Sequence, residues 1–67
     1  MMKQRDLMRE LFERYGDDEK IIVSEYARAE REGRVQRASD ESRMTPEDYA
    51  RRLFYDGKVK GWIRGNE

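Results

Sequence analysis

The chain contains no cysteine and no histidine, and only one proline and one tryptophan, among its 67 residues. Without cysteine and histidine it lacks the usual general base near neutral pH, the soft metal ligands and a thiol nucleophile. The absence of cysteine also excludes disulfide bonds. We therefore expect no enzyme activity, no metal site and no cofactor.

Large aliphatic and phenylalanine side chains are scarce. The chain has three leucines, three isoleucines, three valines and two phenylalanines, about 16% of its residues. A domain of this size buries only about 60% of the surface that its unfolded chain exposes, so its stability is marginal. Because disulfides are excluded, oligomerisation is the common remedy for so small a core. The composition therefore predicts association with a second copy.

No apolar run is long enough for a signal peptide or a membrane span, so we expect a soluble, cytoplasmic protein that does not enter a membrane. The net charge is zero, but the charge is unevenly distributed. Residues 49–67 contain five basic and two acidic residues, a net charge of +3, and residues 1–48 carry the compensating −3. A basic C-terminal third favours either a polyanion or a complementary surface on another copy.

Hydrophobic periodicity predicts three helices, over residues 2–15, 18–32 and 46–56. In the first, apolar side chains recur at helical spacing before the stop at Gly16: Leu7, Met8, Leu11, Phe12 and Tyr15.

The acidic run from Asp17 to Glu19 lacks the ligand spacing and the central glycine of a calcium loop, so we interpret it as the start of the second helix. The three β-branched residues 21–23 are compatible with a strand, but Ile22 and Tyr26 continue a helical stripe. We favour one helix closed by Gly33.

The third helix has the clearest start, because Thr45 can cap it and Pro46 fits its first turn. Its apolar stripe comprises Tyr49, Ala50, Leu53 and Phe54, and acid–base pairs are expected between Glu47 and Arg51 and between Asp48 and Arg52. Gly57 is expected to end it.

Two segments are predicted to lie outside the helices. Residues 33–45 are polar and are interpreted as a loop or hinge. Residues 57–67 form a C-terminal arm, in which 58–63 could be a short strand, an irregular turn or a docking segment. Trp62 and Ile63 are expected to be buried against another surface, because burying a large apolar side chain is worth about 2–3 kcal/mol.

The C-terminal pattern resembles a group of small uncharacterised bacterial proteins about 65–70 residues long. The resemblance covers roughly residues 22–64 and is carried by Tyr49-Ala50, Asp56-Gly57 and Lys60 to Ile63, preceded by Gly33, Val35, Arg37 and Ser39. It implies a compact domain that pairs with a second copy, including by exchange of an end segment, and it implies no activity.

These observations predict a mainly α protein of about three short helices, intertwined or segment-exchanged as a homodimer, which serves as an interaction module. The expected dimer interface comprises Leu11, Phe12, Tyr49, Leu53, Phe54, Trp62 and Ile63. The competing prediction is that these residues build the core of a monomer. A further possibility is that a different protein covers the apolar stripe of the first helix.

Nucleic-acid binding is the alternative function. Basic residues of the C-terminal third are interleaved with Tyr55 and Trp62, and aromatic faces can stack on unpaired bases while basic groups contact phosphates. The expected contact residues are Arg51, Arg52, Lys58, Lys60 and Arg64. The net charge of zero and the acidic helix neighbours of Arg51 and Arg52 weigh against this function.

Overall fold

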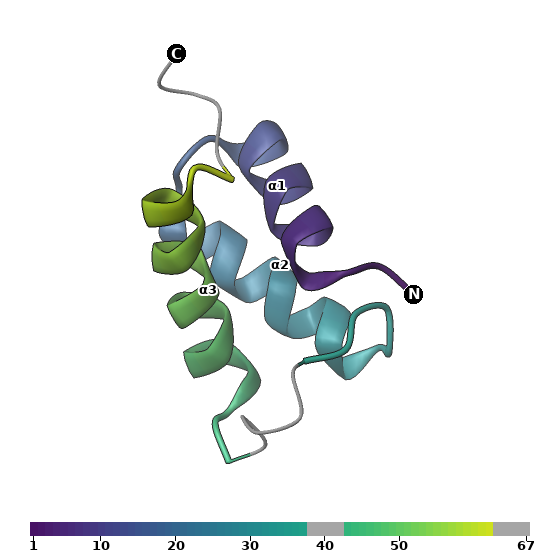
Figure 1. The fold of residues 1–67 in the computed structure, drawn as a ribbon. Coiled ribbons are helices and arrows are strands. Elements are labelled where there is room, and N and C mark those ends of the chain that lie inside the picture. The colour runs from purple at the N-terminus through teal and green to yellow at the C-terminus, as the bar shows by residue number, and fades with distance from the viewer. Residues whose placement is uncertain (38–42, 63–67) are drawn as a thin grey trace.

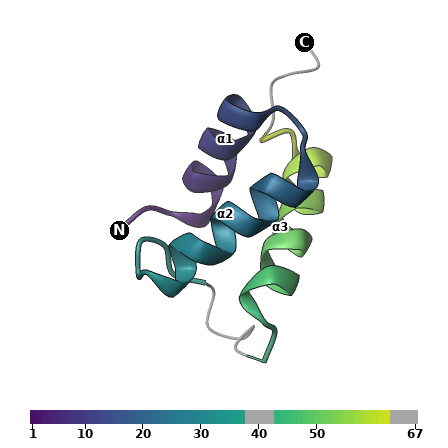
Figure 2. The ribbon, with the colours of Figure 1, turned by 180° about the vertical axis from the view of Figure 1, so that it is seen from behind.

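The computed structural model describes residues 1–37 and 43–62. In these residues the chain forms three helices and no strand: α1 (Gln4–Tyr15), α2 (Glu19–Arg31) and α3 (Pro46–Lys60). The helix α2 crosses behind α1 and α3 in Figure 1 and lies in front of them in the reverse view of Figure 2. The predicted mainly α class is confirmed.

The helix ends follow local capping chemistry. The Asp18 carboxylate accepts a hydrogen bond from the Ile21 N–H at 3.3 Å, and the Thr45 hydroxyl accepts one from the Asp48 N–H at 3.1 Å. Each bond satisfies a first-turn N–H group that has no partner within its helix. At the end of α1, Gly16 has φ +68°, which favours glycine. These three predicted boundaries are confirmed.

The β-branched run 21–23 belongs to α2, not to a strand. Ile22 and Val23 are buried, whereas Ile21 is exposed, so burial follows the helical stripe that continues to Tyr26. The tertiary contacts of this stripe outweigh the modest preference of β-branched residues for strands.

Aromatic residues compensate for the few aliphatic side chains in the core. The rings of Phe12 and Phe54 stack with their centroids 5.0 Å apart, which joins α1 to α3. Tyr26 is fully buried, and Tyr49 is nearly so. The core cluster consists of Leu7, Met8, Leu11, Phe12, Ile22, Val23, Tyr26, Ala29, Val35, Tyr49, Ala50, Leu53 and Phe54.

The first helix was predicted to begin at residue 2, but α1 begins at Gln4. Met2 pairs instead with the segment after α2. The Met2 N–H donates to the Arg34 carbonyl at 3.0 Å, and Met2 and Val35 form an isolated parallel bridge. Val35 is buried in the core. The predicted loop is confirmed for residues 33–37 and 43–45, and residues 38–42 lie outside the described part.

The predicted end of the third helix at Gly57 is wrong. The alternative of a short strand beginning at residue 58 is also wrong, because residues 58–60 are helical. The helix α3 continues to Lys60 and ends at Gly61, whose φ is +78°. Gly57 is buried inside the helix, where the Trp62 ring packs against it, so this glycine provides space and not a stop. Trp62 is partly buried against the core, as predicted, and Ile63 lies outside the described residues.

Candidate functional site

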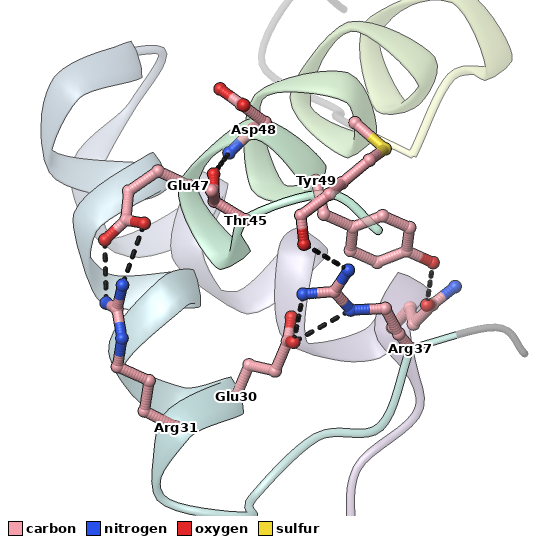
Figure 3. Close-up of polar contacts among 9 residues, drawn as sticks. Glu30, Arg31, Arg37, Thr45, Glu47, Asp48 and Tyr49 are labelled. Carbon is pink, nitrogen blue, oxygen red and sulfur yellow. Dashed lines mark hydrogen bonds and ion pairs between the residues drawn. The ribbon is translucent and has the colours of Figure 1, made fainter. Parts of the chain in front are cut away.

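A partly buried ion pair lies where the segment after α2 meets the start of α3 (Figure 3). Arg37 donates from Nε and Nη2 to Oε2 of Glu30 on α2, at 2.8 and 2.5 Å. Its Nη1 donates to the Met44 carbonyl at 2.6 Å. The two side chains are only 15% and 17% exposed, so water screens this pair far less than a surface pair. A single guanidinium therefore joins α2 to Met44, which lies two residues before the start of α3.

The same guanidinium also reaches α3 and, through it, α1. The Arg37 Cζ atom lies 4.9 Å from the centroid of the Tyr49 ring, within the range of a cation–π interaction. The Tyr49 hydroxyl donates a hydrogen bond to Oε1 of Gln4, the first residue of α1. The polar cluster, defined as Gln4, Glu30, Arg37 and Tyr49, thus contacts all three helices.

Tyr26 lies one helical turn before Glu30 on α2, and its side chain is fully buried. Burial raises the pKa of the Tyr26 hydroxyl well above its usual value, and the nearby Tyr49 and Glu30 raise it further, against a smaller opposing effect of Arg37. The hydroxyl therefore stays neutral at physiological pH. It can donate a hydrogen bond, but it cannot act as a general base there.

A second ion pair joins α2 to α3 at the surface (Figure 3). Arg31 donates two parallel hydrogen bonds to the carboxylate of Glu47, at 2.7 and 2.9 Å. The hydrogen bonds that Arg31 donates lower the pKa of Glu47, and the same bonds raise the pKa of Arg31. Glu47 thus pairs across to another helix and not with Arg51, its expected partner on α3.

The residues predicted to form a dimer interface lie together in the core of one chain. Five are at most 5% exposed: Leu11, Phe12, Tyr49, Leu53 and Phe54. The partly buried Trp62 packs beside Phe12, and Ile63 is outside the described residues. A dimer that used these five side chains would have to exchange whole segments, because none offers a free surface in this arrangement.

The residues predicted to contact nucleic acid do not form one uniform patch. Arg51 pairs with Asp48 at 3.1 Å and with Glu19 of α2 at 3.6 Å. The Lys58 ammonium lies 5.2 Å from the centroid of the Phe54 ring. Arg52 and Lys60 are exposed, and Arg64 lies outside the described residues. Arg51 and Lys58 therefore already contact neighbouring side chains of the same chain.

A mixed apolar and basic surface runs along the solvent side of α3. Tyr55 is 54% exposed and Val59 is 85% exposed, and they lie one helical turn apart. Arg52 and Lys58 lie beside them and are also exposed. We call these four residues the α3 outer face. Val59 was missed as a site residue because the helix was expected to end at Gly57, and only a continuous helix places it beside Tyr55.

A groove of about 420 Å³ separates the exposed sides of α2 and α3 and is lined by Glu19, Lys20, Val23, Ser24, Glu47 and Arg51. Its charged groups are largely engaged in the ion pairs described above. Within residues 1–37 and 43–62, no group of three or more acidic side chains is arranged to hold a metal ion. None of the described helices combines the length and the apolar character required to cross a membrane.

Comparison with protein family models, with curated proteins and with solved structures found no match to this chain. The resemblance to the group of small bacterial proteins therefore stays a prediction.

Replacing Arg37 by methionine should lower the free energy of unfolding by about 3 kcal/mol, because it leaves the Glu30 carboxylate buried without its charged partner. Replacing both residues by methionine should recover more than half of that loss, since no buried charge remains. Urea denaturation followed by circular dichroism measures both effects.

The matched control is Arg28→Met, which breaks the exposed pair between Arg28 and Glu32 on the same helix. This change should cost less than about 1 kcal/mol. An Arg37→Met protein no less stable than this control would contradict the role assigned to the polar cluster.

The Arg31–Glu47 pair should make stability depend on pH. Because the folded pKa of Glu47 lies below its usual value of 4.5, the pair stabilises the folded state above about pH 4.5. This contribution is lost as the pH falls through the lowered pKa. The stability difference between the natural chain and Arg31→Met should therefore be present at pH 7 and vanish in acid.

Urea denaturation at several pH values measures this difference, with Arg5→Met as the control, since Arg5 is exposed at the start of α1. A difference that persists unchanged below the pH at which Glu47 is protonated would show that Arg31 acts through packing and not through its charge.

Proposed function

We propose that the chain is a small interaction module that pairs with a second copy through the α3 outer face. The exposed Tyr55 and Val59 carry the proposal, because they place two apolar side chains side by side on a helix whose opposite side is already buried. Exposed apolar residues scattered singly need no explanation, whereas an adjacent pair on a regular helix is typical of a contact surface.

The distribution of charge along α3 favours a second copy as the partner. The first turn carries Glu47 and Asp48, and the last turn carries Lys58 and Lys60. If two α3 helices pack antiparallel, the acidic turn of each lies beside the basic turn of the other, and the two helix dipoles also align favourably. The arrangement is self-complementary, as a two-fold dimer requires.

The proposed contact is small. One helix face against another buries less than the roughly 1,200–2,000 Å² of a stable interface, so the pairing should be weak and reversible. A dissociation constant in the micromolar range, about −8 kcal/mol or weaker, is the expectation.

Sedimentation equilibrium from about 1 to about 300 µM protein should show a reversible increase above the monomer mass of 8.1 kDa. The double variant Tyr55→Ala/Val59→Ala should remain a monomer over this range, because it removes the apolar contact. Its helical content should be nearly unchanged, since both side chains are exposed.

The control is Ile21→Ala, which shortens an exposed apolar residue on α2. It should associate as the natural chain does. A natural chain that stays a monomer at the highest concentration, or a double variant that still associates, would contradict the proposal.

Nucleic-acid binding is the second candidate for the same surface. The observation that favours it is the position of the Tyr55 ring, which is half exposed between the basic residues Arg52 and Lys58. A single strand could stack one base on this ring while its phosphates contact the basic groups.

Fluorescence anisotropy with a labelled single-stranded oligonucleotide tests this candidate at about 50 and about 200 mM salt. Arg52→Gln/Lys58→Gln should weaken salt-sensitive binding at least tenfold. The control Lys3→Gln/Arg5→Gln removes the same charge from an exposed region at the other end of the chain. Absence of binding, or equal loss in both variants, would reject the candidate.

A further inference from the structure

The last turn of α3 follows a glycine and is therefore weak on its own. Gly57 is an interior residue of the helix, and the turn after it contains Lys58, Val59 and Lys60. Glycine in a helix interior favours the helical state roughly fivefold less than alanine does. Contacts from outside the turn are therefore needed to keep it helical, and Val59 lies within it.

Two backbone hydrogen bonds close the turn on Gly57. The N–H groups of Gly61 and Trp62 both donate to the Gly57 carbonyl, the second at 2.9 Å. Gly61 adopts the left-handed conformation, with φ +78° and ψ +24°. The bond from Trp62 spans five residues, as in a Schellman motif, which commonly also has a hydrophobic contact between the same two positions.

That hydrophobic contact is made by the Trp62 ring on Gly57. A Cβ atom added at Gly57 would lie 3.0 Å from Cε3 and 3.6 Å from Cδ2 of the ring, and 3.5 Å from Cε2 of Phe12. Because Gly57 has no side chain, the indole ring of Trp62 packs directly against the helix at this position, with Phe12 of α1 beside it. Gly57 therefore lowers the helix propensity of the turn but also leaves space for the Trp62 ring, which stabilises the same turn.

We infer that Trp62 is a positioning residue for the α3 outer face. Its ring and its N–H keep the last turn helical, and the helix makes Tyr55 and Val59, four residues apart, close neighbours on one side. When the Trp62 ring no longer packs on Gly57, the turn unwinds and Val59 moves away from Tyr55. The inference rests on the proposed pairing of two copies, but Trp62 itself is assigned no contact with the partner.

The primary test is Trp62→Ala. Amide hydrogen exchange at Lys60, Gly61 and residue 62 should become at least tenfold faster than in the natural chain, while exchange in α2 stays the same. In sedimentation equilibrium the variant should pair at least tenfold more weakly, although Tyr55 and Val59 are intact. Trp62→Phe should retain part of the slow amide exchange and part of the pairing, because a smaller ring can still pack on Gly57.

A rescue variant separates positioning from direct contact. In the Trp62→Ala background, Gly57→Ala adds a Cβ that no longer meets the indole and makes only an ordinary 3.5 Å contact with Phe12. It should favour the helical turn roughly fivefold. Slow amide exchange and pairing should therefore both recover by up to about fivefold without the ring.

The outcomes are distinct. Unchanged amide exchange in Trp62→Ala would overturn the inference, and so would a rescue variant that regains the slow exchange but not the pairing, because Trp62 would then contact the partner itself. If the natural chain is a monomer, the proposed function fails, whereas the exchange data still show whether Trp62 holds the turn.

Discussion

The partly buried pair between Arg37 and Glu30 is the contact on which the arrangement of the three helices depends. The guanidinium joins α2 to the Met44 carbonyl at the start of α3, and the Tyr49 ring carries the contact on to Gln4 of α1. A largely buried charge is costly unless all its partners are in place. The pair therefore favours one arrangement of the helices over others that would bury a similar apolar area.

Local rules predicted most of the fold. Capping by Asp18 and Thr45, the stop at Gly16 and the apolar stripes are properties of neighbouring residues, so the sequence alone indicates them. The end of α3 could not be predicted in this way. A glycine after an aspartate is typical of a helix stop, and only the Trp62 ring from beyond the helix shows why Gly57 lies inside it.

The candidate sites were less predictable, because they depend on contacts between distant segments. The polar cluster joins residues up to 45 positions apart in the chain, and nothing in the sequence indicated that Arg37 pairs with Glu30. Phe12, Tyr49 and Phe54, which were expected at a dimer interface, are buried within one chain here, and hydrophobic periodicity identifies a buried side but not what buries it. The α3 outer face could not be predicted, because it includes Lys58 and Val59, which lie beyond the predicted end of the helix.

In the structure one chain completes its own core, and the α3 outer face is left exposed. Isotope-filtered nuclear Overhauser spectroscopy on a mixture of labelled and unlabelled protein, unfolded and refolded together, tests it most directly. We expect contacts between the rings of Phe12 and Phe54 only within one chain, where their centroids are 5.0 Å apart. Contacts between these rings across labelled and unlabelled chains would contradict it, because they would show that the core is built from exchanged segments.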